Sequence, residues 1–507
     1  MQIREHVGAG KAAVILHPSG TIVTFDELEA RANRLAHYFR QAGLREGDAV
    51  AILMENNEHI HAVMWAARRS GLYYVPINTH LTAAEAAYIV DNSAAKAIIG
   101  SAALRKTCEN LCPQPGGPPG LLMMAGSDAG DLEGWACYPE CVADQPDTPI
   151  DDELEGDLLQ YSSGTTGRPK GIKRELPHVP PSQAPGMMSE LVSFWMTPDS
   201  IYLSPAPLYH TAPSVWSMSA QAGGITTVVL EKFDPEGCLD AIQRYRVTHG
   251  QFVPAMFTRM LKLPDSVRNS YDLSSLQRVM HAAAPCPVEI KKQMIDWWGP
   301  IIDEYYASSE AIGSTLISAE QWLAHPGSVG KPMACQIHIL DEEGNELPPG
   351  QAGEIYFEGG YSFEYLNDEA KTTASRDRHG WTTVGDIGYV DDEGYLYLTD
   401  RRHHMIISGG VNIYPQETEN LLVTHPKVLD AAVFGVPDDE MGQRVVAAVQ
   451  TVDPADATAE FADELTGWLR DRLAHYKCPR SIDFEAQLPR TDTGKLYKNG
   501  LIEKYSV

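Results

Sequence analysis

Apolar positions in the first 100 residues recur with two periods, and these periods predict alternating helices and strands. Thr24–Glu27 has the pattern of a capping box and precedes apolar residues at helical spacing, so a helix is predicted there, with Gly43 at its end. Short apolar runs at Ala49–Leu53, Tyr73–Ile77 and Ala97–Ile99 predict buried strands. This alternation is typical of parallel sheets that helices cover on both faces.

The same alternation returns after residue 200 and then changes. Further strands are predicted at 201–204, 226–230, 251–253, 279–282 and 301–305. Between 330 and 400, short strands such as Gln336–Leu340 and Gly353–Glu358 are separated by turns, which predicts a small antiparallel, barrel-like subdomain. Residues 112–157 are rich in Pro, Gly and Asp and predict an irregular connection. Beyond Arg401, a last group of helices and strands predicts a smaller α+β unit, so the fold class is α/β.

Composition limits the classes of partner. The 507 residues carry 40 Lys and Arg against 68 Asp and Glu, a formal net charge of −28, which disfavours binding to nucleic acids and to anionic membrane surfaces. No apolar run reaches the roughly 18 residues that a membrane span needs. Eight cysteines are few for this length, so a reduced, cytoplasmic protein is expected. The oligomeric state is left open, with a homodimer as one expectation.

Two cysteine pairs share one spacing, Cys108 with Cys112 and Cys137 with Cys141. Four thiols at that spacing could bind zinc. The favoured interpretation is four reduced thiols, because no closely spaced histidine accompanies them.

Residues 161–171 form the most informative segment, Tyr-Ser-Ser-Gly-Thr-Thr-Gly-Arg-Pro-Lys-Gly. Small residues let backbone N–H groups approach an anion, hydroxyls add donors, and Arg168 and Lys170 balance phosphate charge. The Walker pattern is absent. Composition alone leaves phosphate binding and a flexible Gly/Ser/Thr loop as alternatives.

Residues 163–171 also resemble the phosphate loop of the adenylate-forming superfamily, which contains acyl-CoA synthetases, peptide-synthetase adenylation domains and beetle luciferases. Further segments resemble motifs of this family in the family's order, namely residues 24–28, 208–210, 306–310, 381–386, 400–415 and 489–495. The resemblance therefore covers nearly the whole chain.

The resemblance implies a two-step reaction and a two-domain chain. ATP and a carboxylic acid give an acyl-adenylate and pyrophosphate, and the thiol of CoA then takes the acyl group and releases AMP. The implied domains are an adenylate-forming body over 1–402 and a mobile lid over 403–507. The cofactors implied are ATP/AMP, CoA and Mg²⁺.

The resemblance also assigns site residues. The implied nucleotide-binding residues are Ser163, Gly164, Thr165, Thr166, Gly167, Ala283, Ala284, Pro285, Tyr306, Ala307, Ser308, Ser309, Asp386 and Arg401. The implied catalytic residues are Lys170, His210, Glu310 and Lys495, with Glu310 as the ligand of Mg²⁺ and His210 in the segment of an aromatic gate. The implied hinge is His403, and Gly409 and Gly410 would approach the pantetheine arm of CoA.

Some positions depart from the family pattern. Ser309 replaces a threonine, Ala307 replaces a glycine, and Ala311 stands where relatives often have glycine. His403 stands where the family hinge is usually Asp or Lys. A variant that mainly performs the second half-reaction on a supplied acyl-adenylate is therefore one alternative.

The acid is expected to be hydrophobic and bulky. The segments around His281 and Trp297 resemble a branch that includes bile-acid and long-chain acyl-CoA ligases, and Trp216 and Met218 are apolar candidates for the acyl pocket with His281. The alternatives are loading of a separate carrier protein, a luciferase-like oxygenase, and a catalytically silent nucleotide-binding protein.

Overall fold

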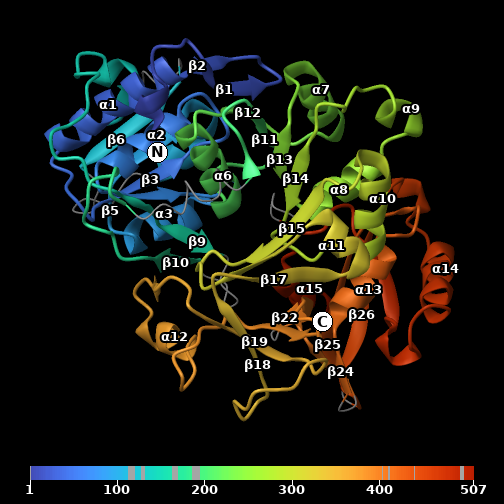
Figure 1. Ribbon diagram of the computed structural model, residues 1–507. Coiled ribbons are helices and arrows are strands. Elements are labelled where there is room, and N and C mark those ends of the chain that lie inside the picture. Colours follow the sequence, from blue (N-terminus) through green and yellow to red (C-terminus); the bar gives the residue numbers. More distant parts are fainter. Residues whose placement is uncertain are drawn as a thin grey trace. The chain divides into compact units, whose positions relative to one another are not determined.

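The structure is a computed structural model that describes residues 2–111, 120–126, 132–162, 169–184, 195–401, 404–408, 411–438, 440–490 and 496–506. The chain divides into two compact units (Figure 1). The first unit contains Met1–Gln251, Asp272–Gln277 and Tyr361–Thr373, and the second contains Phe252–Tyr271, Arg278–Gly360 and Ala374–Val507.

A six-stranded parallel sheet forms the first part of the first unit. Its order is β7-β6-β5-β3-β4-β8, with β3 (Ala49–Leu53), β4 (Tyr73–Pro76), β5 (Ala95–Ser101), β6 (Leu121–Ala125), β7 (Ala136–Tyr138) and β8 (Asp157–Leu158). Helix α1 (Phe25–Gln41) precedes β3, and α2 (Ile60–Arg69), α3 (Ala83–Asn92) and α4 (Arg105–Asn110) connect the strands that follow. The predicted parallel α/β arrangement is therefore confirmed.

Both faces of this sheet are buried. On β3, Val50 and Ile52 pack in one apolar cluster with residues of α1 and α2, whereas Ala51 and Leu53 pack in a second cluster with residues of α3. A strand covered on both sides is apolar at every position, which explains the continuous apolar run in the sequence.

The beginning and the end of α1 follow the predicted signals. The Glu27 backbone N–H donates to Oγ1 of Thr24 at 3.2 Å, and the Thr24 N–H donates to Oε2 of Glu27 at 2.8 Å. The helix ends at Gln41, and Gly43 has a φ of +87°, a conformation that glycine adopts without steric cost.

The prediction of an irregular connection over 112–157 was wrong in part. Residues Leu121–Ala125 form β6, which pairs with β5, and Ala136–Tyr138 form β7, which pairs with β6. Both strands are short and are flanked by Pro, Gly and Asp, so local composition concealed them. In the structure β6 pairs with the edge of β5, and β7 pairs with β6, and these long-range contacts cannot be inferred from the apolar run Leu121–Ala125 alone.

The first unit also carries a second group of strands. The order is β2-β1-β12-β11-β13, with β1 (Ala12–His17), β2 (Ile22–Thr24), β11 (Ile201–Ser204), β12 (Thr226–Leu230) and β13 (His249–Phe252). Helices α6 (Thr211–Ala222) and α7 (Pro235–Tyr245) connect these strands. The β1–β12, β12–β11 and β11–β13 pairs are parallel, and only β2 runs antiparallel to its neighbour in this group.

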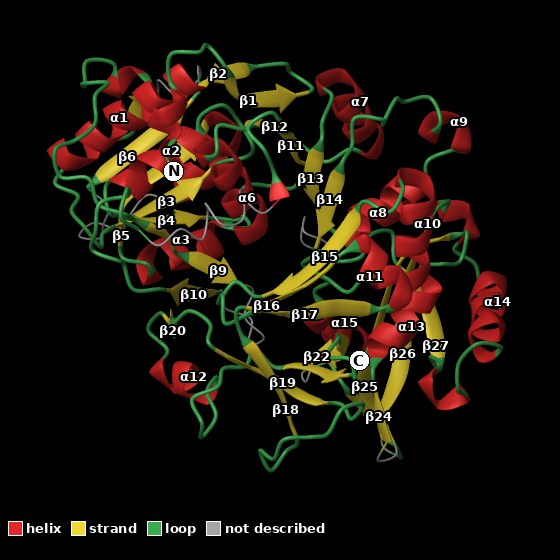
Figure 2. Ribbon diagram, in the orientation of Figure 1, coloured by secondary structure: helices red, strands yellow, loops and turns green. Residues whose placement is uncertain are grey.

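The second unit begins with two parallel strands and continues with antiparallel ones (Figure 2). In sheet order they are β14 (Arg278–His281), β15 (Ile302–Ala307), β16 (Ser314–Ile317), β17 (Ser328–Met333), β22 (Leu396–Arg401), β21 (Asp386–Val390), β19 (Gly353–Glu358) and β18 (Gln336–Leu340). The helices are α8 (Pro254–Leu261), α9 (Asp265–Arg268), α10 (Val288–Trp298) and α11 (Ala319–Ala324), whereas α12 (Glu369–Ala374) belongs to the first unit except for its last residue. The predicted antiparallel strands between 330 and 400 are confirmed.

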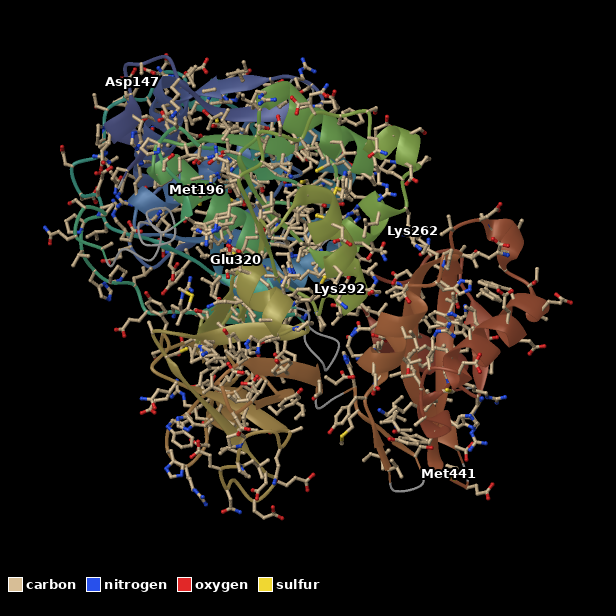
Figure 3. All side chains as sticks on the ribbon, turned by 45° about the vertical axis from the view of Figure 1, so that its right-hand side comes forward. Asp147, Met196, Lys262, Lys292, Glu320 and Met441 are labelled. Carbon is tan, nitrogen blue, oxygen red and sulfur yellow. The ribbon has the colours of Figure 1, made fainter. Side chains whose placement is uncertain are left out.

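The C-terminal part of the second unit has its own sheet and two apolar clusters. Its elements are β23 (Ile406–Ser408), β24 (Val411–Ile413), α13 (Pro415–Leu422), β25 (Val428–Asp438), β26 (Gly442–Thr451), α14 (Ala459–Arg470), β27 (Ser481–Phe484) and α15 (Lys498–Tyr505). Met441, labelled in Figure 3, lies in the turn between β25 and β26. Along β25, Val433 packs with residues of α13 and α14, and Phe434 packs with residues of α15.

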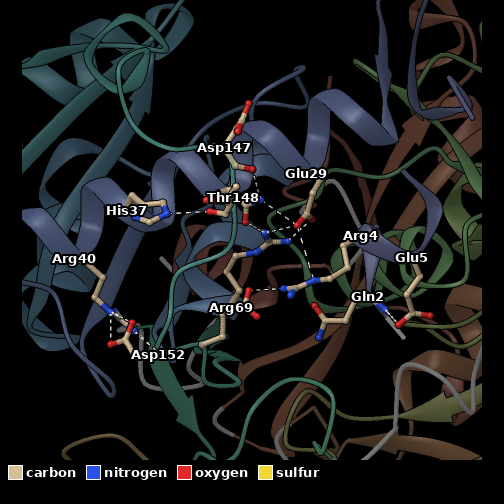
Figure 4. Close-up of polar contacts among 12 residues, drawn as sticks. Gln2, Arg4, Glu5, Glu29, His37, Arg40, Arg69, Asp147, Thr148 and Asp152 are labelled. Carbon is tan, nitrogen blue, oxygen red and sulfur yellow. Dashed lines mark hydrogen bonds and ion pairs between the residues drawn. The ribbon is translucent and has the colours of Figure 1, made fainter. Parts of the chain in front are cut away.

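A buried ion pair joins α1 and α2 (Figure 4). The Arg69 guanidinium is 1% exposed, and its two terminal nitrogens lie 2.9 and 2.6 Å from the two carboxylate oxygens of Glu29. Asn33 accepts a further hydrogen bond from Arg69 and donates to the Asp147 carbonyl at 2.7 Å. A buried charge is tolerated only with such partners, so this network fixes the segment around Asp147 against α1.

A buried histidine joins α2 and α6. His61 is 2% exposed, and its Nε2 lies 3.1 Å from Oγ of Ser217, which itself donates to the Ser214 carbonyl at 3.0 Å. Ser217 therefore accepts from His61, which carries its proton on Nε2. Burial lowers the pKa of His61 from an ordinary 6.5 to about 3, so the imidazole is neutral at neutral pH.

Within the described parts of the chain, no helix has the length and apolar character that crossing a membrane requires.

The buried His61 makes stability depend on pH. Between its unfolded pKa of 6.5 and its folded pKa of about 3, only the unfolded chain binds the proton, so stability falls as the pH is lowered. We expect the free energy of unfolding to lose roughly 1.4 kcal/mol per pH unit from this group alone below pH 6.5. Urea unfolding of wild type and His61→Gln from pH 7.5 to pH 5 measures this contribution. The variant should show the shallower pH dependence, and equal slopes would contradict the prediction.

Candidate active site

Two loops of the second unit leave the sheet at the same edge. Strands β14 and β15 are parallel, with Met280 opposite Asp303 and His281 opposite Glu304. Because parallel strands end at the same edge, the Ala282–Pro285 segment after β14 emerges beside the Tyr306–Glu310 segment, which comprises the last two residues of β15 and the three that follow. The structure thus brings together two segments that the sequence predicts for nucleotide binding.

A closed polar cluster lies at the ends of these two strands. The Lys291 ammonium on α10 is 2.7 Å from Oε2 of Glu304, and Nε2 of His281 is 3.2 Å from the same oxygen. Burial alone would raise the pKa of the Glu304 carboxyl, but His281 and Lys291 hold it at about 2. Burial lowers the pKa of His281, while the neighbouring Glu304 carboxylate acts in the opposite direction.

The sequence predicts that His281 lines the acyl pocket, and the cluster around this side chain bears on that role. Its side chain has no exposed surface, and its neighbours are Glu304 on the adjacent strand and Phe257, at 5.5 Å between ring centroids. The structure therefore puts His281 inside the sheet packing and not on an accessible wall. The sequence offered no sign of this, because Lys291 and Glu304 are too far from it along the chain.

The candidate ribose site is built by Tyr306 and Asp386. The Tyr306 hydroxyl donates to Oδ2 of Asp386 at 2.6 Å, and Asp386 is 6% exposed. Asp386 is the first residue of β21 and lies opposite Arg401 in the β21–β22 register. Asp386 and Arg401, both implied nucleotide-binding residues, are thus neighbours across a strand pair, and Tyr306, a third one, contacts Asp386.

Glu310 is the candidate ligand for Mg²⁺. It follows β15 and is 8% exposed, whereas Ala307 is exposed and Ser308 and Ser309 are half-buried. Among the described residues, no group of three or more His, Cys, Asp or Glu side chains could hold a metal ion. An ion at Glu310 would therefore take further ligands from phosphate and water, which is the usual environment of Mg²⁺.

Two alanines near these loops have left-handed backbones. Ala283 has a φ of +76° and Ala311 a φ of +56°. A side chain at Cβ disfavours this conformation by about 1–2 kcal/mol. The resemblance to the family implies that position 311 often holds glycine, and the positive φ of Ala311 is the physical reason. Ala283 has the same left-handed backbone, which the sequence did not indicate.

The first unit carries the remaining described candidates for phosphate binding. Strands β9 (Gln160–Ser162) and β10 (Lys170–Lys173) are antiparallel, with Lys170 opposite Ser162, and β20 (Glu364–Tyr365) pairs with β10. The half-buried Lys170, which belongs to the predicted phosphate loop 163–171, is the first residue of β10. Ser163, Gly164, Thr165, Thr166 and Gly167 lie outside the described residues.

The candidates for the acyl pocket are distributed over α6. His210 is the N-cap residue of this helix, and its ring centroid is 4.5 Å from that of Tyr209. Trp216 packs edge-on against Trp195 at 5.2 Å. Met218 is fully buried in the apolar cluster that contains α1 and α2. Residues two positions apart on a helix point about 200° apart, so Trp216 and Met218 lie on different faces of α6.

An aromatic cluster of the first unit was missed by the sequence analysis. Trp195 contacts His249 at 5.3 Å as well as Trp216, and it is 4% exposed. These three residues come from segments that are far apart in the chain, and only the pairing of β13 with β11 brings His249 to this region.

Several predicted residues lie outside the described parts of the chain. These are the catalytic Lys495, the hinge residue His403 and the two glycines Gly409 and Gly410. Arg401 is placed only by its backbone register. Their roles stay predictions.

The cysteine pairs are described in part. Cys108 is buried against Gly100, whereas Cys137 and Cys141 are half-buried, and Cys112 lies outside the described residues. Burial raises the pKa of the Cys141 thiol to about 11, which keeps it protonated at neutral pH.

Comparison with known proteins shows the family. The AMP-binding enzyme model matches residues 3–364, and the AMP-binding enzyme C-terminal domain model matches residues 417–495. The chain therefore belongs to the AMP-binding enzyme family, the adenylate-forming acyl-CoA ligases. It is an enzyme of the AMP-forming acid–CoA ligase type.

Individual relatives support this membership. A feruloyl-CoA synthase of Amycolatopsis is 33% identical, covering 97% of this chain and 96% of the relative. The long-chain-fatty-acid–CoA ligase FadD13 of Mycobacterium tuberculosis is 32% identical, covering 96% and 93%. The crystal structure of ATP-bound MatB from Rhodopseudomonas palustris matches with a TM-score of 0.83 and 27% identity, covering 99% of this chain and 98% of that one. One of these relatives is a long-chain ligase, as the resemblance predicts, whereas the resemblance to bile-acid ligases stays a prediction.

The left-handed alanines lead to a stability prediction. Ala283→Gly and Ala311→Gly remove a Cβ that disfavours the observed φ, and this gain exceeds the entropy that glycine loses on folding. We expect each variant to raise the free energy of unfolding by about 0.5–1 kcal/mol, measured by urea denaturation. Ala284→Gly, whose φ is not left-handed, is the matched control and should be destabilising. A loss of stability in Ala283→Gly equal to that of the control would contradict the strain.

Proposed function

We propose that this enzyme activates a bulky, hydrophobic carboxylic acid with ATP and Mg²⁺ and transfers the acyl group to CoA. In the first step a carboxylate oxygen attacks the α-phosphorus of ATP, and pyrophosphate leaves. In the second step the CoA sulfur attacks the acyl carbon, and AMP leaves.

The observation that carries this proposal is the contact between Tyr306 and Asp386 beside two loops from parallel strands. A carboxylate with two acceptor oxygens suits the two ribose hydroxyls. The Tyr306 ring beside it offers a flat surface to adenine, and the small residues Ala283 and Ala284 allow a base to approach from the other loop. Pro285 and Ala307 to Ser309 would complete the lining of this nucleotide site.

Four side chains are proposed to bind the phosphates, the Mg²⁺ ion or the ribose of ATP in the first step. The attack brings two anions together, so cations must stabilise the developing charge. Lys170, at the end of the predicted phosphate loop 163–171, would balance phosphate charge, and Lys495 would contact acyl and phosphate oxygens as a point charge. Glu310 would hold Mg²⁺, which neutralises phosphate charge when bound. Arg401 would add a ribose contact.

The second step is assigned to the C-terminal part. We propose a body over 1–402 and a lid over 403–507 that moves about His403 between the two steps. Gly409 and Gly410 would line the path of the pantetheine arm, where a side chain would obstruct it.

The acid is inferred from the apolar surroundings of α6. His210 stands at the beginning of this helix, and Trp216 packs with Trp195 in an aromatic cluster. Aromatic side chains bury large apolar areas, which favours a large apolar acid over acetate. The names of two relatives, a feruloyl-CoA synthase and a long-chain ligase, agree with an acid of this class.

The proposed reaction is tested in two formats. Exchange of labelled pyrophosphate into ATP is measured with acetate, benzoate, ferulate, dodecanoate and cholate. The adenylates of the same acids are then supplied with CoA. Activity in both formats supports the complete ligase. Activity only with supplied adenylates favours the half-reaction alternative, and acylation of a carrier protein without acylation of CoA would reject CoA as the acceptor.

Substitution of the proposed catalytic lysine should separate the two steps. Lys495→Ala removes the cation used in adenylation, so the exchange rate should fall about 100-fold or more, while thioester formation from a supplied adenylate changes little. Lys427→Ala, which breaks an exposed ion pair with Asp456 in the same C-terminal part, is the control. Equal losses of Lys495→Ala in both assays would contradict its assignment.

The two faces of α6 predict different effects. Trp216→Ala should change the ratio of kcat/KM between ferulate and acetate by about 10-fold or more and leave the KM for ATP within about twofold. Met218→Ala, on the opposite face, should lower the free energy of unfolding by about 2–5 kcal/mol without changing the order of acids. If Trp216→Ala left the ratio of kcat/KM between ferulate and acetate unchanged, the proposal that Trp216 lines the acyl pocket would be wrong.

A further inference from the structure

One buried side chain of the first unit, Asn56, joins three separate segments of the chain. Asn56 lies in the connection between β3 and α2 and is 6% exposed. Its Nδ2 donates to the Leu230 carbonyl at 2.8 Å and to the Ala206 carbonyl at 3.2 Å. Its Oδ1 accepts the backbone N–H of Leu208 at 2.8 Å. Both N–H bonds and the carbonyl oxygen of this amide are therefore used.

The partners of Asn56 lie at the ends of two parallel strands. Leu230 is the last residue of β12, and Ala206 comes two residues after the end of β11. Because β11 and β12 are parallel, both strands end at the same edge of their sheet. Asn56 itself comes three residues after the end of β3, which belongs to the six-stranded sheet. The side chain thus connects the carboxyl ends of strands from two sheets.

The groups that face Asn56 require an amide at this position. Two of them are carbonyl oxygens, which accept hydrogen bonds, and the third is an N–H, which donates one. A carboxylate of the same shape would turn an oxygen toward both carbonyls, and an alanine would remove all three hydrogen bonds. Buried backbone groups that lose a partner destabilise their present arrangement. The segment bonded to Asn56 therefore depends on this side chain for its position.

Residues 206–210, the segment that Asn56 holds, lead directly into α6. Leu208 is buried, and His210, the N-cap residue of α6, is half-buried. The His210 N–H donates to the Pro207 carbonyl at 3.2 Å, so the segment turns tightly before the helix begins. A shift of the Leu208 backbone is therefore passed to the His210 ring, only two residues further along.

Other contacts of residues 206–210 do not involve Asn56. Nε2 of Gln160 on β9 donates to the Tyr209 carbonyl at 3.4 Å, and the Leu208 side chain is fully buried in the apolar cluster that contains α1 and α2. Because these contacts persist when Asn56 is replaced, we expect the segment to be displaced while the unit stays folded. A displacement of about 1 Å near a reacting centre can lower a rate about 100-fold.

We propose that Asn56 is a positioning residue that fixes residues 206–210 and thereby sets the selectivity of the enzyme for its carboxylic acid. This inference rests on the proposed function, which assigns His210 and α6 to the acyl site. Asn56 acts through the backbone of Ala206 and Leu208, so it needs no contact with the acid. Its loss should raise the KM for the acid and lower the discrimination between acids, while the KM for ATP changes little.

A merely structural role would give a different result, and Asn33 on α1 is the matched control. Asn33 is 1% exposed, and its Nδ2 also donates to two acceptors, Oε1 of Glu29 at 3.1 Å and the Asp147 carbonyl at 2.7 Å. Neither acceptor belongs to a residue that is assigned to the site. Asn33→Ala therefore removes a buried amide of the same size from the same unit and leaves the contacts of residues 206–210 in place.

The experiment measures kcat and KM of the full-length chain for the acids of the panel acetate, benzoate, ferulate, dodecanoate and cholate, and the KM for ATP. Wild type, Asn56→Ala and Asn33→Ala are compared at a temperature at which thermal unfolding shows each of them to be folded. For Asn56→Ala, we expect the KM for the fastest acid to rise about 10-fold or more, while the KM for ATP stays within about twofold. The ratio of kcat/KM between the fastest and the slowest acid should fall about 10-fold.

Asn33→Ala should keep the wild-type KM values and the wild-type ratio between acids. Unchanged acid KM values in Asn56→Ala, or equal changes in the two alanine variants, would overturn the inference.

Isosteric variants keep the test decisive if the alanine substitution impairs folding. Asn56→Asp retains the volume and an acceptor for the Leu208 N–H but loses both donors, and Asn33→Asp is its matched control. We expect Asn56→Asp to raise the acid KM although no cavity is created, and Asn33→Asp to leave it unchanged. A loss of activity that followed thermal stability across all four variants, with the acid KM unchanged, would overturn the positioning role.

His210→Ala and Trp216→Ala separate failure of this inference from failure of the proposed function. If either of them changes the acid KM and the Asn56 variants do not, only the positioning role fails. If neither changes the acid KM, the assignment of residues 206–210 and α6 to the acyl site fails, and with it the basis for this inference.

Discussion

The parallel pairing of β14 and β15 is the constraint on which the candidate nucleotide site depends. Its register sets His281 opposite Glu304, and both strands therefore end at one edge, where their following loops emerge together. Lys291 on α10 then adds a cation to the same Glu304 oxygen that His281 approaches. A slip of one residue would turn these side chains to the other face, so the buried cluster specifies the register that aligns the two loops.

Buried cations recur at points where two elements of the fold meet. Arg69 is paired with Glu29, Lys291 with Glu304, and Lys498 with Glu419. Desolvation makes such pairs costly unless hydrogen bonds satisfy both partners, so their contribution to stability is small compared with the geometry that they define. The net charge of −28 therefore says little about the local field, because paired groups and oriented N–H donors set that field in the interior.

Elements that depend on neighbouring residues were predicted from the sequence, and elements that depend on contacts between distant segments were not. The capping box of α1 and the buried strand β3 were predicted because each depends on neighbouring residues or on a local period. The strand β6 was missed because pairing with β5 determines it. The acyl-pocket residues show the same division, since an apolar composition cannot tell that Trp216 and Met218 point to opposite faces of α6.

The sequence by itself determined the family, the order of its motifs and the residue types that the chemistry needs, because those depend on local strings such as residues 163–171 and 306–310. Only the tertiary structure decided which of them meet. The contact of Tyr306 with Asp386, the approach of His281 to Glu304 and the ion pair of Arg490 with Asp430 all join segments separated by tens of residues. Such contacts arise from strand pairing and core packing, which are properties of the whole fold and leave no signal in a local pattern.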